Sequence, residues 1–292
     1  MPVRKVLPFL LHFSVRNRLS APEKSSLLPT AYLSCQLLDV FCDYFTLKVT
    51  STCSDLDQQT SSSPVVCPDL CSSSVLQSFY PVSELELRSV ILMSKPTTCS
   101  VDPIPTSLFL DCLDDLLPTL IGIVIDSPLS GSLPSLFKHA VVKPLLKKPT
   151  LDHNNIRNDR PVSNLSFLSG VIKKIVLRQL FAYLNSHDLL CLSQSAYRPW
   201  RSTETALLKI TNEILRALDN GDVAVLTLLD LSSAFDTIDH YILLRRFQSL
   251  YGISSTILSW FESYLTGRTQ SVTVNDKSSR PADVSFGVPQ IA

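Results

Sequence analysis

The chain has 292 residues, of which 45% are hydrophobic, and its 26 lysines and arginines balance its 26 aspartates and glutamates. This length allows one large domain or two ordinary ones, and the apolar fraction is ample for a buried core, so a globular protein is expected. The net charge of zero argues against a nucleic-acid partner, and the lack of any run of 18 apolar residues argues against a membrane span.

Charge is distributed unevenly along the chain. Residues 50–137 carry ten acidic and two basic residues, whereas residues 138–180 carry nine basic and two acidic ones. A basic block of this kind can follow the phosphates of a nucleic acid, and the alternative is a set of solvated faces. The candidates for nucleic-acid contact in this block are Lys147, Lys148, Lys173 and Lys174.

Residues 1–78 are expected to form a poorly specified, disordered N-terminal segment, with a linker-like stretch rich in Ser, Thr and Cys at residues 51–74. The first residues imitate a leader peptide only loosely, because Pro8 and His12 interrupt the apolar run. Seven of the eight cysteines lie in the first 112 residues without the spacing of a zinc site. Reduced thiols and an intracellular location are therefore expected.

Residues 79–137 are interpreted as a helical region that precedes the main domain. A first helix is predicted from Val82 to Met93, where apolar residues recur with helical spacing. A second helix is predicted from Thr106 to Ile125, despite an internal proline.

Residues 138–292 are interpreted as the main domain and begin with a strand and a helix. Lys138 to Leu146 contains the apolar Val141 and Val142, is closed by Pro144 and Pro149, and is expected to be extended. Leu168 to Leu184 carries an apolar stripe and is predicted to be an amphipathic helix, with Lys173 and Lys174 on a basic exterior face.

A third helix is predicted to begin at Ser202 or Thr203, whose hydroxyl can cap the first amides, and to end at Asn220-Gly221. Val223 to Leu229 follows as a continuous apolar run that is too short for an ordinary helix. We expect this run to be a buried central strand of a sheet.

The remaining pattern predicts two helices and a hairpin. The helices are expected from Asp239 to Leu250 and from Ser255 to Leu265. Arg268 to Asn275 alternates between apolar and polar residues and is predicted to pair with Ala282 to Phe286 in a β-hairpin. The fold class expected from these elements is α+β, rich in helix.

Asp230 ends the predicted central strand and is the first candidate for chemistry. A carboxylate at the end of a buried strand is a well-placed ligand for Mg²⁺, with the backbone carbonyl of Leu231 as a second oxygen, although at least one more carboxylate is required. Asp236 and Asp239 are expected to cap the next helix rather than to bind metal. His240 is expected to be a surface or hydrogen-bonding residue rather than a general base.

Several ordered segments share one resemblance. They are Lys143 to Pro149 (KPLLKKP), Asn158 to Leu165 (NDRPVSNL), Gln194 to Arg198 (QSAYR), Ser202 to Ala206 (STETA), Leu229 to His240 (LDLSSAFDTIDH) and Gly287 to Gln290 (GVPQ). In order and spacing they resemble the reverse transcriptases of non-LTR, LINE-type retrotransposons. The order of several motifs makes the resemblance specific.

The resemblance implies the fingers and part of the palm of a right-hand polymerase, with a small antiparallel palm sheet. It implies an RNA template, a DNA primer and deoxynucleotides as partners. Asp230 then resembles the first Mg²⁺ ligand, assisted by the carbonyl of Leu231. Phe235 resembles the aromatic gate below the incoming sugar, and the alternative is a core aromatic.

The resemblance also implies nucleotide contacts for three polar residues. Arg198 matches the fingers arginine aimed at the triphosphate, and Arg160 lies in a motif near template and nucleotide. Either arginine could instead be a surface ion-pair partner. Gln290 matches a glutamine beside the nucleotide, and Gly287 permits close approach of the backbone.

The chain departs from the family pattern at its end. Ile291-Ala292 stands where the family continues with Gly and Ser, and the later Ala-Asp-Asp hairpin and the thumb do not follow. We therefore expect a truncated and catalytically incompetent polymerase. The alternatives are a non-catalytic remnant that binds RNA or an RNA–DNA duplex, and the product of a decayed element without a selected role.

Overall fold

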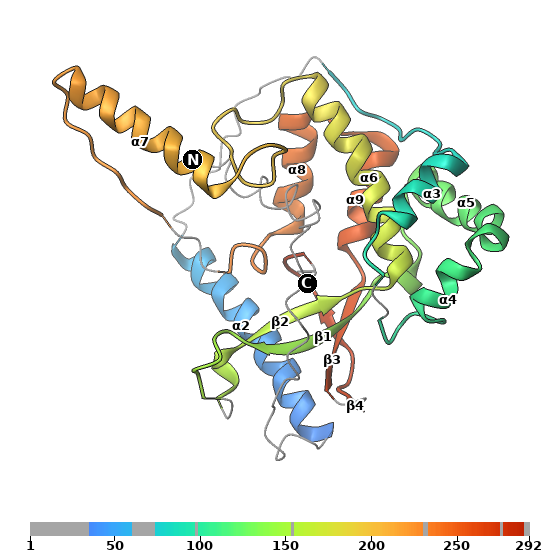
Figure 1. Ribbon diagram of the computed structural model, residues 1–292. Coiled ribbons are helices and arrows are strands. Elements are labelled where there is room, and N and C mark those ends of the chain that lie inside the picture. The colour runs from blue at the N-terminus through green and yellow to red at the C-terminus, as the bar shows by residue number, and fades with distance from the viewer. Residues whose placement is uncertain are drawn as a thin grey trace.

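The computed structural model describes six stretches of the chain (Figure 1), namely residues 35–59, 74–96, 99–152, 155–229, 233–274 and 277–288. Its α-helices are α2 (Cys35–Gln59), α3 (Glu84–Leu92), α4 (Thr106–Asp111), α5 (Leu113–Ser130), α6 (Phe167–Ser186), α7 (Thr203–Asp219), α8 (His240–Tyr251) and α9 (Ser255–Leu265). Its strands are β1 (His139–Leu146), β2 (Asp159–Asn164), β3 (Arg268–Val274), β4 (Lys277–Ser278) and β5 (Ala282–Val284). In the stretches described, none of the helices combines the length and apolar character needed to cross a membrane.

The strands form one mixed sheet. β1 pairs antiparallel with β2 on one side and parallel with β3 on the other, and β3 pairs antiparallel with both β4 and β5. The expected hairpin of Arg268 to Asn275 with Ala282 to Phe286 is confirmed by the pairing of β3 with β5. The expectation of a purely antiparallel sheet is wrong, because β1 and β3 run in the same direction.

The main hydrophobic core lies among the helices and includes residues from both 79–137 and 138–292. At its centre Trp260 of α9 is fully buried, stacks on Tyr264 at 5.3 Å between ring centroids, and donates from Nε1 to Ser127 Oγ of α5 at 3.1 Å. The indole N–H therefore keeps a partner inside the core, as a buried tryptophan requires. Helices α3, α5, α6, α8 and α9 all contribute buried side chains to this core.

Helix α2 covers one face of the sheet and forms a second, smaller core. Its Phe41 and Phe45 pack in a cluster with Val142 of β1 and Val272 of β3. An ion pair of 2.6 Å between Asp43 and Arg280 ties the same helix to the turn after β4. Residues 35–59 were expected to belong to a poorly specified segment, and this expectation is wrong because their apolar face is used to cover the sheet. Most of the linker-like stretch, residues 60–73, lies outside the described residues.

Helix α7 and the segment after it project from the body of the molecule (Figure 1). The predicted helix ends are confirmed, since Ser202 caps the first turn and Gly221 follows Asn220 with a φ of 82°. However, α7 has no buried residue, and residues 223–229 form neither strand nor helix. The expectation that Val223 to Leu229 is a buried central strand is wrong, because the projecting α7 leads this segment away from the sheet.

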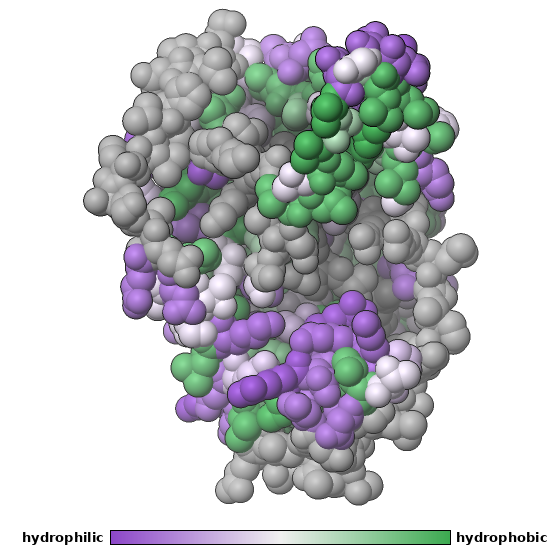
Figure 2. Space-filling view, turned by 90° about the vertical axis from the view of Figure 1, so that its left-hand side faces the viewer, coloured by the Kyte–Doolittle hydropathy of each residue, from purple (hydrophilic) through white to green (hydrophobic). Residues whose placement is uncertain are grey.

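The projecting part leaves a large apolar surface in contact with solvent. The exposed side chains include Leu207, Leu208, Leu215 and Leu218 of α7 and Val223, Val225, Leu226, Leu228 and Leu229 after it. Figure 2 views the molecule from this side and shows a broad hydrophobic surface above a hydrophilic one.

The other helix predictions are confirmed with small shifts at their ends. α3, α6, α8 and α9 occupy the predicted positions. The helix predicted from Thr106 to Ile125 is instead two helices, because the backbone leaves the helical region at Cys112 with φ −98° and ψ 16°. Pro118 is accommodated inside α5.

Candidate functional site

Three of the predicted site residues lie outside the described residues. They are Asp230, Leu231 and Gln290. The positions of the metal-binding carboxylate, the assisting carbonyl and the glutamine beside the nucleotide therefore stay predictions. Their immediate chain neighbours, residues 233–240 and 285–288, are described and form the centre of the candidate site.

Two of the family-like segments come together at this centre. The amide of Val288 donates to the carbonyl oxygen of Phe235 at 3.0 Å, and the amide of Gly287 donates to that of Ile238 at 2.8 Å. Gly287 has a φ of 76°, and a Cβ at this position would lie 2.7 Å from the carbonyl oxygens of both Phe235 and Asp236. The expectation that Gly287 permits a close backbone approach is confirmed.

The start of α8 fixes one side of this contact. Asp239 accepts a hydrogen bond from the amide of Ile242 at 2.8 Å and is the N-cap of the helix, so the predicted capping role is confirmed. His240 lies next to it, with Nε2 2.8 Å from the carbonyl oxygen of Gly287. Burial lowers the pKa of His240, while the Gly287 carbonyl and Asp239 oppose that shift. His240 is thus the hydrogen-bonding residue that we expected.

Phe235 is partly buried and packs against the main core. This position agrees with the alternative of a core aromatic, and the role of Phe235 as a gate for the sugar stays a prediction. Asp236 lies in the same turn, where its amide donates to the carbonyl oxygen of Ser233 at 2.9 Å. It does not occupy the N-cap of α8, so the capping role expected for Asp236 is wrong.

Arg198 lies in the loop between α6 and α7. Its Nη1 atom is buried and, within the described stretches, has no hydrogen-bond partner. The neighbouring Arg201 holds the loop by donating from Nη1 to the carbonyl oxygens of Leu192 and Gln194, at 2.8 and 2.6 Å. Tyr197 adopts a φ of 58°, an uncommon value for a residue with a side chain. Arg198 is therefore a cation with a free donor on a closely held loop.

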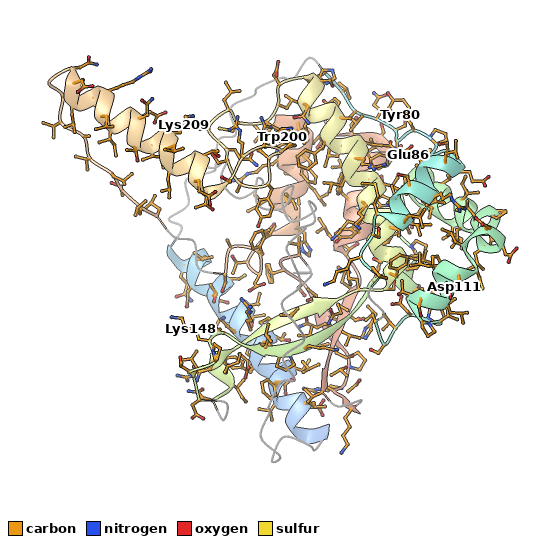
Figure 3. All side chains as sticks on the ribbon, in the orientation of Figure 1. Tyr80, Glu86, Asp111, Lys148, Trp200 and Lys209 are labelled. Carbon is orange, nitrogen blue, oxygen red and sulfur yellow. The ribbon has the colours of Figure 1, made fainter. Side chains whose placement is uncertain are left out.

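The β1–β2 hairpin carries several exposed cations of the basic block, among them Lys148 (Figure 3). Arg160 of β2 is exposed and lies opposite Leu145 of β1. Lys147 donates from Nζ to the carbonyl oxygen of Arg157 at 2.6 Å, and Lys148 is exposed beside it. These side chains are accessible to an anionic partner, and their role in nucleic-acid contact stays a prediction.

The two lysines of α6, Lys173 and Lys174, are less exposed than the cations of this hairpin. Lys173 is only 4% exposed, and burial, Lys174 and Arg268 together lower its pKa to about 7. Lys174 is partly buried and donates from Nζ to Ser94 Oγ at 2.8 Å. The expected basic exterior is therefore wrong for Lys173. It lies on the same helix face as the buried Ser169 and Val176, four residues before and three after it.

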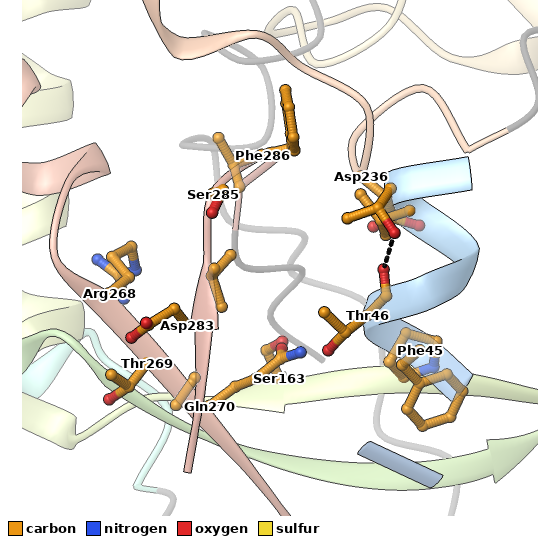
Figure 4. Close-up of a pocket in the computed structure, with 16 residues that line it drawn as sticks. Phe45, Thr46, Ser163, Asp236, Arg268, Thr269, Gln270, Asp283, Ser285 and Phe286 are labelled. Atoms are coloured by element: carbon orange, nitrogen blue, oxygen red, sulfur yellow. Dashed lines mark hydrogen bonds between the residues drawn. The ribbon is translucent and has the colours of Figure 1, made fainter. Parts of the chain in front are cut away.

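A cavity of about 100 Å³ lies beside the contact between the two segments (Figure 4). Its walls come from α2, the sheet, Asp236 and residues 283–288, excluding Gly287. Arg268 also lines the cavity, and the sequence pattern treated it only as the start of a strand. The one sequence feature that could have indicated a special position for Arg268 is a charged residue directly after Gly267, at the beginning of a buried strand.

Metal ligands are not grouped in the described part of the chain. No cluster of three or more His, Cys, Asp or Glu side chains is present there. Asp230 and Leu231 offer one carboxylate and one carbonyl oxygen, which are donors that Mg²⁺ prefers but are fewer than it needs. The described residues thus do not by themselves provide a magnesium site.

Comparison with known proteins identifies one family. Residues 146–290 match the family described as reverse transcriptase (RNA-dependent DNA polymerase). The chain is 26% identical over 179 residues to the RNA-directed DNA polymerase from mobile element jockey of Drosophila melanogaster, a match that covers 61% of this chain and 19% of the relative.

Two further relatives give the same result. The corresponding jockey protein of Drosophila funebris is 25% identical over 211 residues, covering 72% of this chain and 23% of the relative. A protein named "Probable RNA-directed DNA polymerase from transposon BS" of Drosophila melanogaster is 27% identical over 157 residues, covering 54% and 17%. The match therefore spans less than a quarter of each of these relatives.

Proposed function

We infer that this chain contributes the template-holding part of an RNA-directed DNA polymerase of a LINE-type mobile element, because its residues 146–290 match the reverse transcriptase family. The observation that supports this role most directly is the contact between the Phe235 turn and the Gly287-Val288 segment. Two separate family-like motifs meet there at hydrogen-bond distance, and in the sequence they lie close to Asp230 and Gln290, the residues proposed for metal and nucleotide.

Polymerases use paired divalent metal ions to hold both the attacking and the leaving oxygen of the phosphoryl transfer. In our proposal Asp230 and the Leu231 carbonyl hold Mg²⁺ together with further carboxylates of the whole polymerase. The ion would stabilise the negative charge that develops on the reacting phosphate. Arg198 and Gln290 would orient the deoxynucleotide, and Phe235 would limit the space below its sugar.

The β1–β2 hairpin is proposed to hold the RNA template with its DNA primer. Lys147, Lys148 and Arg160 are exposed on this hairpin and carry no ion pair in the described stretches. Exposed cations of this kind bind phosphates with an affinity that falls as salt displaces the bound counterions.

A binding experiment with an RNA–DNA template–primer tests this proposal. Fluorescence anisotropy should give a dissociation constant that rises with salt. The double variant Lys147→Gln/Lys148→Gln should bind more weakly and should reduce the salt slope by roughly 2, about one for each phosphate contact. The matched control is Lys209→Gln/Arg216→Gln, which removes two charges from the projecting α7 and should bind like the wild type.

Primer extension with Mg²⁺ and deoxynucleotides tests the proposed metal ligand. Incorporation that disappears in Asp230→Ala but persists in Asp222→Ala would support Asp230 as a ligand. Binding without incorporation would restrict the chain to holding the duplex, which is the non-catalytic alternative. Absence of binding at low salt would refute both roles.

A further inference from the structure

Trp200 is the most exposed large apolar residue in the part of the chain that the structure describes. It is 99% exposed, whereas Trp260, the second of the two tryptophans, is fully buried. Trp200 lies in the loop that leads from the body of the molecule into α7 (Figure 3). Tryptophan is highly buried on average, so a ring that lies wholly in solvent calls for a physical reason.

The backbone turn that carries Trp200 favours glycine at this position. The amide of Arg201 donates to the carbonyl oxygen of Arg198 at 3.3 Å, so residues 198–201 form a β-turn with Pro199 and Trp200 at its centre. Trp200 has a φ of 62°. A proline in the second position and a positive φ in the third define a type II turn, whose third position prefers glycine. The side chain of Trp200 therefore strains the backbone, and strained residues of this kind gather at ligand-binding sites.

Hydrogen bonds fix this turn against the preceding part of the loop. Nη1 of Arg201 donates to the carbonyl oxygens of Leu192 and Gln194, and Nε2 of Gln194 donates to the carbonyl oxygen of Ala196 at 3.0 Å. The backbone below Trp200 is thus held in place before any ligand binds. Because a fixed loop loses little conformational freedom on binding, the exposed ring is well prepared for a contact.

The charges next to Trp200 in the sequence are mainly positive. Arg198 and Arg201 form the two ends of the turn, and among the described residues neither takes part in an ion pair. Glu204, in the first turn of α7, is the only acidic residue between positions 194 and 206. An exposed aromatic ring with neighbouring cations is the combination that binds single-stranded nucleic acids, because the ring stacks on a base while the cations attract phosphates.

We propose that Trp200 is a stacking platform for an unpaired base of a nucleic-acid strand, with Arg198 and Arg201 attracting the adjacent phosphates. The inference rests on the proposed function, since it takes the template as the ligand. It assigns the loop before α7 to the single-stranded part of the template, whereas the β1–β2 hairpin is assigned to the template paired with its primer. Bases inside a duplex are covered by their stacked neighbours, so the ring of Trp200 favours a strand whose bases are free.

Tryptophan fluorescence of the full chain, titrated with a short single-stranded oligouridine RNA, tests the stacking directly. Stacking on a base quenches the emission of an indole ring, and Trp260 is shielded because it is buried and donates to Ser127. We expect saturable quenching that follows the binding curve measured by fluorescence anisotropy of the labelled RNA. An abasic strand of the same length keeps the phosphates without the bases, so it should bind more weakly and should leave the emission of Trp200 unchanged.

Substitutions of Trp200 separate the ring from the fold. Trp200→Ala should weaken the binding of oligouridine by about fivefold to a hundredfold, the range expected for the loss of one base–aromatic stack. Trp200→Phe keeps a ring and should bind nearly as tightly as the wild type. The matched control is Tyr80→Ala, which removes a 72% exposed aromatic side chain before α3 and should bind like the wild type.

Trp200→Gly keeps the experiment independent of stability. The turn prefers glycine and the Trp200 side chain lies in solvent, so this variant should be at least as stable as the wild type in urea denaturation. It should nevertheless bind oligouridine as weakly as Trp200→Ala does. A stable Trp200→Gly variant with the affinity of the wild type would overturn the proposal.

The remaining outcomes distinguish this proposal from the proposed function. If oligouridine binds in anisotropy but leaves the emission of Trp200 unchanged, or if the abasic strand quenches it equally, the stacking role is overturned and the template-holding role stands. If neither strand binds at low salt, both are overturned. If vesicles of anionic lipid shift the emission to the blue and oligouridine does not change it, Trp200 contacts a membrane surface instead of a base, and the proposal is overturned as well.

Discussion

The amide of Val288 donates a hydrogen bond to the carbonyl oxygen of Phe235 at 3.0 Å. This contact joins a turn that follows the proposed metal ligand to a segment that precedes the proposed nucleotide-contacting glutamine. Helix α8 contacts the second of these segments, because Nε2 of its first residue, His240, lies 2.8 Å from the carbonyl oxygen of Gly287. The geometry of the candidate site thus depends on a backbone contact between Gly287 and residues 235–238.

Substitution of Gly287 should destabilise the chain more than substitution of another glycine with the same backbone conformation. In Gly287→Ala the new Cβ would meet two backbone carbonyl oxygens at 2.7 Å, in addition to the cost of a φ of 76°. We expect a loss of at least about 2 kcal/mol in the free energy of unfolding, measured by urea denaturation.

The control for this prediction is Gly221→Ala. Gly221 has a φ of 82°, but no atom lies within 4 Å of the position of a Cβ. Gly221→Ala should therefore lower the free energy of unfolding only by the conformational penalty of about 1 kcal/mol. Equal losses in the two variants would mean that the close approach of Gly287 to Phe235 does not exist in solution.

The stability of the chain should depend on the protonation of His240. Burial lowers the pKa of His240 below its ordinary value of 6.5. Between the lowered pKa and 6.5 the unfolded chain binds a proton that the folded chain does not, so the free energy of unfolding should fall as the pH drops below about 6.5. His240→Asn should reduce this fall in urea denaturation series from pH 8 to 5.

Burial also lowers the pKa of His139, so the comparison needs a second histidine variant. His187→Asn changes an exposed histidine at the end of α6 and should leave the pH dependence as it is in the wild type. If the two variants show the same pH profile, then the burial of His240 against Gly287 does not control the response.

The free energy of unfolding should also depend on pH above 7, because of Lys173. Its pKa of about 7 is lower than the ordinary value of 10.5, so the unfolded chain binds more protons than the folded chain between these two values. The free energy of unfolding should therefore rise from pH 7 to about 10, by an amount on the order of a few kcal/mol. In Lys173→Met this rise should be smaller, whereas Lys209→Met on the exposed α7 should retain it.

The elements that the sequence predicts well are those determined by short-range patterns. α8 and α9 follow from apolar spacing, and the cap by Asp239 follows from a polar residue directly before a helix. Lys173 could have been assigned to the buried face of α6 from its spacing to Ser169 and Val176. We predicted an exposed position for Lys173 because a charged side chain usually lies in solvent.

Long-range features could not be obtained in the same way. The helical pattern of Cys35–Gln59 is weak, and only the sheet that it covers explains its order. The parallel pairing of β1 with β3 joins strands about 130 residues apart, which no local pattern reports. The burial of Arg268 against Tyr264 is likewise a contact between β3 and α9 that the sequence pattern did not report.

The apolar run after α7 is buried according to its sequence pattern and exposed in the structure, and substitution of its residues can test which is right. Val225 is 86% exposed, although its neighbours suggest a buried strand, whereas Val272 of β3 is fully buried. The change from Val to Thr keeps the shape of the side chain and replaces one methyl group by a hydroxyl, so its cost reports burial directly. Val225→Thr should change the free energy of unfolding by less than about 0.5 kcal/mol, and Val272→Thr should lower it by about 1 to 3 kcal/mol. Urea denaturation of the two variants measures both values. A loss for Val225→Thr as large as that for Val272→Thr would place residues 223–229 inside a sheet and would contradict the projecting arrangement of α7.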